Sequence, residues 1–171
     1  METLKRTNPE QYNAYQMIAN THNSFFLTGK AGTGKTTFLK QIQNEVSKNF
    51  LLLAPTGLAA INLGGQTIHS FFGFKFGVLG PGEMGQLNPK KQRLIREIDT
   101  IIIDEVSMVR CDLIDAMDRT LRLYRKNSAP FGGVQMVFVG DMFQLEPVAQ
   151  QNDREILKEI YGTDRCYFYK A

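Results

Sequence analysis

Gly-Lys-Ala-Gly-Thr-Gly-Lys-Thr, residues 29–36, matches the pattern G-x-x-x-x-G-K-[ST] at every required position. The apolar run over residues 24–28 comes immediately before it and predicts a buried strand. Apolar residues at helical spacing follow it, at Phe38, Leu39, Ile42 and Val46. A strand, a glycine-rich turn and a helix N-terminus in this order are typical of a phosphate-binding loop.

The residues of this loop predict how a nucleoside triphosphate would be held. Glycines let backbone N–H groups point inward, and the helix N-terminus contributes about half a positive charge. The Lys35 side chain is expected to reach the β- and γ-phosphates, and the Thr36 hydroxyl is expected to bind Mg²⁺. The predicted nucleotide-binding residues are Gly32, Thr33, Gly34, Lys35, Thr36 and Thr37.

The composition indicates one globular domain. The chain has 171 residues, of which 43% are apolar and 22% charged, so it is long enough to bury a core. Its net charge of +3 permits a nucleic-acid partner without indicating one, because no block of lysines and arginines stands out. Cys111 and Cys166 lack metal-ligand spacing and are expected to be reduced thiols. With no targeting signal and no apolar run long enough for a bilayer, no membrane association is expected.

Strands and helices are predicted to alternate along the chain. Strands are expected at residues 24–28, 50–54, 99–103 and 134–139, with a possible fifth at 166–169. Helices are expected from Asn8-Pro9 onward, after the phosphate-binding loop, and over residues 58–63, 88–98, 112–124 and 153–160. This alternation predicts an α/β fold, with a mostly parallel central sheet and helices on both faces. The glycine-rich residues 73–87 are expected to form a surface excursion outside the core.

Four turns that carry chemically useful residues follow predicted strands, at residues 29–36, 55–57, 104–105 and 140–144. Parallel α/β sheets bind ligands at the carboxyl ends of their strands, so these turns are expected to line one crevice. Asp104 and Glu105 follow three isoleucines in the form of a Walker B strand. Asp104 is expected to hold Mg²⁺ and Glu105 to orient and deprotonate an attacking water. An exposed acidic pair at a turn is the alternative interpretation.

Three further polar residues have structural interpretations beside any functional one. The Gln144 amide could contact a γ-phosphate and report the state of the nucleotide, or it could be a surface residue in a turn. Gln11 fits the third position of a capping box headed by Asn8. For His69, taken alone, a hydrogen-bonded structural role is favoured, and no Cys/His metal cluster accompanies it in the sequence.

Five blocks in a fixed order carry a resemblance to a known family. They are GKAGTGKT (29–36), APTGLAA (54–60), GQTIHSF (65–71), DEVSMV (104–109) and GDMFQLEPV (140–148). Together they resemble the petite-integration-frequency (Pif-type) helicases, a RecD-like branch of superfamily one. The match runs from about Asn8 to Val148, and residues 112–125 fall where that family carries a signature helix.

The resemblance implies a RecA-like P-loop domain over residues 1–171, the first motor domain of a longer ATP-hydrolysing 5′→3′ DNA helicase. It implies single-stranded, forked and G-quadruplex DNA as partners, and roles in DNA repair, recombination and telomere maintenance. Gln11 falls where the family reads adenine and Gln144 where it couples the γ-phosphate to DNA; Lys35, Glu105 and Gln144 are the implied catalytic residues. The blocks that touch single-stranded DNA contain Thr56, Gly57, Thr67, His69 and Ser70.

Three phenylalanines in or after these blocks, Phe71, Phe72 and Phe74, could stack on bases. Core packing is the competing interpretation and is favoured for Phe71 and Phe72.

The sequence departs from the family pattern by ending soon after the third motif. The family has a second RecA-like domain with arginine fingers, whose positions Arg110, Arg119 and Arg122 do not match. We therefore expect the chain alone, as a monomer, to hydrolyse ATP very slowly and not to unwind DNA. Two other functions stay open, a P-loop ATPase that does not translocate and a non-catalytic nucleotide-binding module. The expected location is the cytoplasm or nucleoid of a bacterium, or the nucleus or mitochondrion of a eukaryote.

Overall fold

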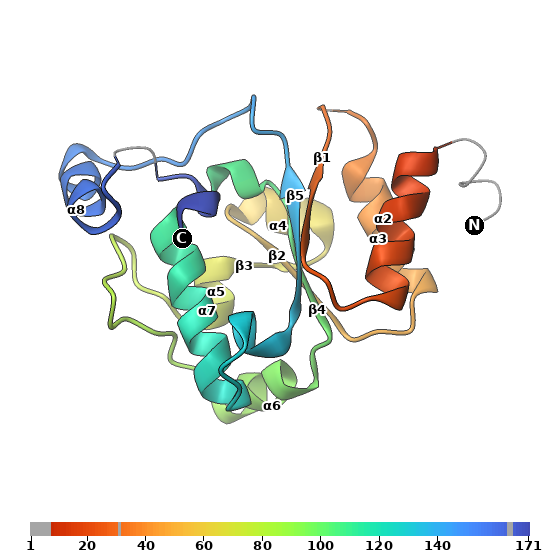
Figure 1. Ribbon diagram of the computed structural model, residues 1–171, viewed down its shortest axis with the longest axis horizontal. Coiled ribbons are helices and arrows are strands. Elements are labelled where there is room, and N and C mark those ends of the chain that lie inside the picture. Colours follow the sequence, from red (N-terminus) through yellow and green to blue (C-terminus); the bar gives the residue numbers. More distant parts are fainter. Residues whose placement is uncertain (1–7, 31, 164–165) are drawn as a thin grey trace.

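A parallel sheet forms the centre of the protein (Figure 1). The computed structural model describes residues 8–30, 32–163 and 166–171. Within these residues five strands pair in the order β1-β5-β4-β2-β3, and every pairing is parallel. The strands are β1 (Phe25–Thr28), β2 (Phe50–Ala54), β3 (Gln66–Thr67), β4 (Thr100–Ile103) and β5 (Gln135–Gly140). The predicted α/β fold with a parallel sheet is confirmed.

Helices connect the strands and cover both faces of the sheet. The α-helices are α2 (Pro9–Asn20), α3 (Lys35–Glu45), α4 (Gly57–Leu63), α5 (Ile68–Phe72), α6 (Pro89–Glu97), α7 (Cys111–Arg125) and α8 (Gln151–Tyr161). Short 3₁₀ turns are η1 (Val106–Met108), η2 (Pro130–Gly133) and η3 (Phe168–Lys170). α2 and α3 pack on one face of the sheet, and α5, α6 and α7 pack on the other (Figure 1). Over the described residues, no helix has both the length and the apolar character needed to cross a membrane.

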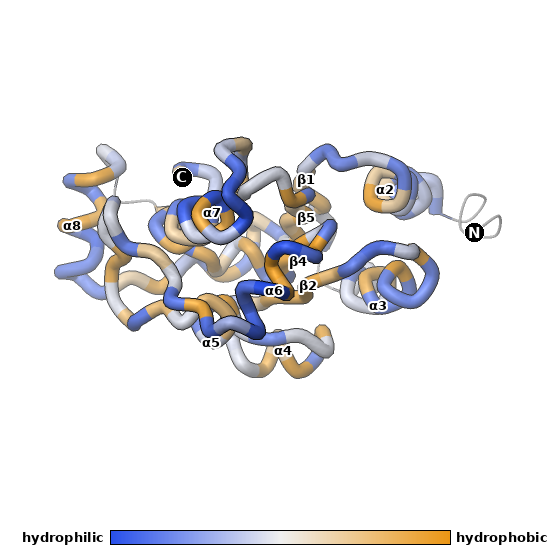
Figure 2. Tube along the Cα trace, turned by 90° about the horizontal axis from the view of Figure 1, so that it is seen from below, coloured by the Kyte–Doolittle hydropathy of each residue, from blue (hydrophilic) through white to orange (hydrophobic). Residues whose placement is uncertain are grey.

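Alternation along the central strands separates two hydrophobic cores. In β4, Ile101 and Ile103 pack into the core beneath α7, whereas Ile102 packs into the core beneath α2 and α3. β2 divides its leucines between the two cores in the same way. Because both faces of these strands are buried, they are continuous apolar runs in the sequence. In Figure 2 they form the hydrophobic layer between the helices.

Two helices begin where the sequence predicts because an asparagine caps each one. The side-chain oxygen of Asn8 accepts the Gln11 N–H at 3.1 Å at the start of α2. The side chain of Asn88 accepts the Lys91 N–H at 2.9 Å at the start of α6. In both helices a proline occupies the first turn, where a missing N–H breaks no intrahelical bond.

The predicted fifth strand at residues 166–169 is wrong. There the chain makes one antiparallel bridge, between Arg110 and Tyr167, and then enters η3. The fifth strand is instead β3, which has two residues and pairs Gln66 with Leu53 of β2. A close approach of Gly65 to β2 precedes this pairing, since a Cβ atom on Gly65 would lie 2.2 Å from the carbonyl oxygen of Leu52.

Residues 73–87 take part in the core, so the expectation that this segment lies outside it is wrong. Three of its apolar side chains, Phe74, Leu79 and Leu87, are buried in the α7 core. Its backbone is also fastened along α7: the Leu79 N–H donates to Asp112 at 2.9 Å and the Gly85 N–H to Thr120 at 2.8 Å. The segment therefore packs along α7, although many of its glycines and polar residues do face solvent.

Candidate nucleotide site and nucleic-acid face

The turn between β1 and α3 is built on glycines with positive φ. Gly32 has a φ of 75° and Gly34, the residue before α3, has a φ of 80°. Side chains other than that of glycine are strained in this region, so the motif needs glycine at both positions. The Gly34 carbonyl accepts the Phe38 N–H at 2.9 Å, which starts the helix directly at the loop. Ala31 lies outside the described residues.

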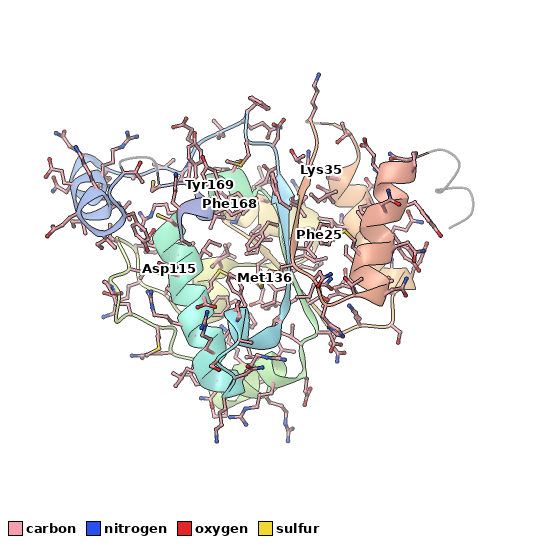
Figure 3. All side chains as sticks on the ribbon, in the orientation of Figure 1. Phe25, Lys35, Asp115, Met136, Phe168 and Tyr169 are labelled. Atoms are coloured by element: carbon pink, nitrogen blue, oxygen red, sulfur yellow. The ribbon has the colours of Figure 1, made fainter. Side chains whose placement is uncertain are left out.

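Lys35 lies over the loop that it follows. Its ammonium group donates to the carbonyl oxygen of Lys30 at 2.9 Å and to that of Gly29. Figure 3 labels Lys35 at the junction of β1 and α3, at the carboxyl edge of the sheet. The positive charge of Lys35 is thus held where the dipole of α3 also favours an anion.

Two oxygen ligands suited to Mg²⁺ meet beside the loop. The Thr36 hydroxyl, in the first turn of α3, donates to a carboxylate oxygen of Asp104 at 3.2 Å. Asp104 follows β4 and is largely buried. Mg²⁺ at nucleotide sites takes only one or two protein oxygens, with phosphates and waters completing its shell. The pair fits such an ion, and no group of three or more His, Cys, Asp or Glu side chains suited to a metal occurs in the described part of the chain.

Glu105 follows Asp104 and has an unusual backbone conformation. Its φ of 53° and ψ of 39° are left-handed, and its N–H donates to the carboxylate of Asp104 at 2.9 Å. Partial burial raises the pKa of the Glu105 carboxyl, and the negative charges of Asp104 and Asp141 raise it further, against an opposing effect of Lys35. A carboxylate whose pKa is raised is a better proton acceptor, as a general base requires.

Asp141 is a functional candidate that sequence reasoning missed. It follows β5 and is only 8% exposed. Its carboxylate accepts the Phe143 N–H at 3.0 Å and the Gln144 side-chain amide at 3.3 Å. These bonds position Gln144 on the loop that follows β5. The available signal was a lone acid directly after an apolar strand, in the same position as Asp104 after β4.

Gln11 approaches the phosphate-binding loop from α2. Its side-chain amide donates to the Thr33 carbonyl at 3.4 Å, so the side chain reaches across to the loop. A pocket of ≈ 200 Å³ opens there, and its lining includes Gln11, Thr28, Thr33, Lys35 and Phe38. The apolar side chains of Leu27 and Phe38 beside the amides of Asn8 and Gln11 suit a purine base, although adenine recognition by Gln11 stays a prediction.

The predicted DNA-binding residues cluster after β2 and β3, beside the nucleotide loops. Thr56 caps α4 by accepting the Ala59 N–H at 3.3 Å, and Thr67 caps α5 by accepting the Ser70 N–H at 3.2 Å. Both threonines therefore have a structural role as well. Gly57 begins α4 and His69 lies within α5. Their contact with DNA stays a prediction.

The phenylalanines suggested for base stacking are buried. Phe71 and Phe72 are fully buried and Phe74 is 8% exposed, so core packing is confirmed for the first two and also holds for the third. Phe76 was not singled out from the sequence, and its side chain is 93% exposed. Its ring stacks on the imidazole of His69, with centroids 5.3 Å apart.

The family model described as PIF1-like helicase matches residues 6–162. The chain belongs to the PIF1-like helicase family. The ATP-dependent DNA helicase PIF1 of Saccharomyces cerevisiae is 40% identical over 156 residues, which cover 85% of this chain and 18% of the relative. The ATP-dependent DNA helicase Pif1 of Bdellovibrio bacteriovorus is 36% identical over 151 residues, which cover 86% of this chain and 34% of the relative.

Solved structures of PIF1-like helicases share the fold. A Bacteroides Pif1 helicase in complex with ADP-AlF3 and single-stranded DNA superimposes with a TM-score of 0.89 at 44% identity, over 95% of this chain and 38% of that one. A Candida albicans Pif1 helicase gives a TM-score of 0.73 at 33% identity, over 95% of this chain and 36% of that one. The chain thus has the RecA-like fold of the family and spans well under half the length of the PIF1-like relatives it matches.

Proposed function

We propose that this chain is the ATP-binding motor module of a DNA helicase that moves 5′→3′ along single-stranded DNA. The observation that carries the proposal is the meeting of Lys35, the Thr36–Asp104 pair and Glu105 at one edge of the sheet. Relatives named ATP-dependent DNA helicases support it, as does a related structure described with ADP-AlF3 and single-stranded DNA.

Each residue of the site has a distinct part in hydrolysis. The Lys35 ammonium offsets charge on the β- and γ-phosphates, and Glu105 orients the attacking water and accepts its proton. Gln144, held by Asp141, contacts the γ-phosphate side of the site. Thr36 and Asp104 would hold Mg²⁺, which neutralises phosphate charge when it is bound.

On this proposal, rapid ATP turnover requires additional catalytic residues. Arginine fingers contribute about 10³–10⁵ in rate, and we assign them to a second RecA-like domain. The chain alone then binds nucleotide as a monomer, hydrolyses ATP slowly and does not unwind DNA. Forked and G-quadruplex DNA are the proposed substrates of the complete helicase, with roles in repair, recombination and telomere maintenance.

Titration calorimetry with Mg²⁺ and a non-hydrolysable ATP analogue tests the nucleotide site. The chain should bind the analogue, and Lys35→Ala should abolish binding while the circular dichroism spectrum stays unchanged. Lys40→Ala, which removes an exposed lysine from the same helix, is the matched control and should bind normally. Equal affinity in Lys35→Ala and the wild type contradicts the assignment.

Stimulation by DNA separates a translocating motor from a P-loop ATPase that does not translocate. In a protein that joins this chain to a second RecA-like domain, single-stranded DNA should raise ATP turnover, and Glu105→Gln should abolish it. ATP turnover that single-stranded DNA does not change favours the non-translocating ATPase. Turnover absent from the wild type as well favours a non-catalytic nucleotide-binding module.

A further inference from the structure

Phe76 exposes an entire aromatic ring on a segment that is otherwise anchored. The side chain is 93% exposed, while its neighbours in the segment, Phe74 and Leu79, are buried. The ring belongs to none of the hydrophobic clusters of the described residues. Phe143 is 100% exposed as well, so the case for a ligand at Phe76 rests on what surrounds its ring.

The ring lies against His69. It stacks on the imidazole of His69 with an interplanar angle of 22°, and the His69 and Phe74 rings form a T-shaped pair with centroids 6.5 Å apart. The residue after Phe76 is fixed as well, because the Arg110 guanidinium donates to the carbonyl oxygen of Gly77. Because the backbone beside Phe76 is already anchored, less entropy is lost when a ligand stacks on the ring.

The surroundings of the ring suit a nucleotide. Phe76, His69, Thr56 and Arg110 line one pocket of ≈ 270 Å³, and the exposed Lys75 precedes the ring. Single strands typically bind where bases stack on an aromatic face and phosphates meet positive charge. Lys75 supplies that charge here, because Arg110 is paired with Asp112 and Asp153. Burial and the nearby Arg110 lower the pKa of His69, so near pH 7 the imidazole is a neutral ring suited to stacking.

We propose that the outer face of Phe76 stacks on one base of a single-stranded nucleic acid, which extends the stack begun by His69 and Phe76. The proposal rests on the proposed function, because it names a base-binding position on the DNA face of the motor module. The other possible occupant is a protein segment that covers the ring in a longer molecule. Stacking on Phe76 is tolerant of sequence, since every base has a π-face.

The test uses the 171-residue chain and oligothymidylate at low salt. Fluorescence anisotropy of a labelled oligonucleotide gives the affinity, and a single 2-aminopurine in the same oligonucleotide reports stacking by quenching. Phe76→Leu keeps an apolar side chain but removes the ring, and should weaken binding by about five- to hundredfold and reduce the quenching. Phe76→Trp should restore both signals. Tyr169→Leu, which removes a 55% exposed ring from η3, is the control and should bind as the wild type does.

The outcomes distinguish the two proposals. If the wild-type chain binds and Phe76→Leu matches it in affinity and quenching, the stacking position is overturned while the motor function stands; a ring that docks protein gives this result. If the wild-type chain binds nucleotide but no single strand at low salt, the DNA face itself is overturned. A loss in Phe76→Leu that Phe76→Trp restores supports stacking.

Discussion

At the residue scale, Glu105 combines a proposed chemical role with a strained backbone. A left-handed conformation costs an L-residue roughly 1–2 kcal/mol, and Glu105 adopts it with a φ of 53°. The conformation is fixed locally, because the Glu105 N–H is bonded to the carboxylate of Asp104. Strain of this kind is typical of positions where function sets the geometry.

Replacing Glu105 by glycine and by alanine separates the strain from the carboxylate. On the proposed function both variants lack the general base, so both should lose ATP turnover in a helicase that contains this chain. Glycine relieves the left-handed conformation and alanine does not, so the glycine variant should be about 1 kcal/mol more stable. Urea unfolding of the chain measures the difference. Equal stabilities would show that the strain is no larger than the extra conformational entropy that glycine loses on folding.

His69 should make folding stability depend on pH. Its pKa is lowered in the folded protein by burial and by Arg110, against an opposing effect of Asp112, from an ordinary value of 6.5. As the pH falls through about 6.5 the unfolded chain binds the proton first, so stability is lost as the pH falls. Urea unfolding between pH 7.5 and 5.5 should show a shallower loss for His69→Gln than for the wild type. Parallel curves contradict a lowered pKa.

Local patterns predict the candidate residues that belong to one short motif. The glycines, Lys35 and Thr36 belong to a short motif, and Asp104 and Glu105 follow a long apolar strand, so both sets could be predicted. Asp141 and Phe76 depend on tertiary contacts. The position of Asp141 is defined by its bonds to the loop after β5, and the exposure of Phe76 is defined by the neighbours that its segment buries.

At the element scale, the order of the strands brings the two predicted sites together. β1, β5 and β4 carry the nucleotide loops, while β2 and β3 lead to Thr56 and His69. Long apolar strands such as β2 and β4 were predictable because burial on both faces leaves a continuous hydrophobic run. β3 could not be predicted, because a strand of two residues is too short to show a periodic pattern. The segment 73–87 was misjudged because its apolar residues are spaced among glycines, and only its bonds to α7 order it.

Gly65 should be required for the pairing of β2 and β3. An alanine Cβ there would overlap the Leu52 carbonyl oxygen, so Gly65→Ala should destabilise the chain by about 1–3 kcal/mol. Gly82→Ala is the matched control, because a Cβ at that position meets nothing within 4 Å. It should change stability by less than about 0.5 kcal/mol. Thermal and urea unfolding of the two variants measures this, and equal effects contradict the close approach.

At the scale of the whole molecule, two ion pairs that share Arg110 join three distant parts of the chain. Arg110 pairs with the fully buried Asp112 at 2.7 Å and with Asp153 of α8 at 3.4 Å. Arg110 also holds the carbonyl of Gly77, and Asp112 accepts the N–H of Leu79. The start of α7, the segment 73–87 and α8 are therefore fixed to one another through these two side chains.

Removing Asp112 should disturb all three parts at once. Asp112→Ala leaves the Arg110 charge without its buried partner and should cost about 3–5 kcal/mol of folding free energy. Asp153→Ala removes the longer, more exposed pair and should cost less than about 1 kcal/mol. Urea unfolding compares them, and hydrogen exchange should show faster exchange of the Leu79 amide only in Asp112→Ala. Comparable losses in the two variants contradict a central role for Asp112.

The pairing of β2 with β4 has a consequence for how the two sites evolve. The Asp104 N–H donates to the Leu53 carbonyl at 2.9 Å, and Thr56 follows Leu53 by three residues. An insertion or deletion of one residue in β2 would shift Thr56 by about 3.3 Å against Asp104 and reverse the facing of every β2 side chain. Length changes in this strand would therefore alter both sites together. On the proposed function, the DNA face would diversify by substitutions and through the loops beyond the strand ends.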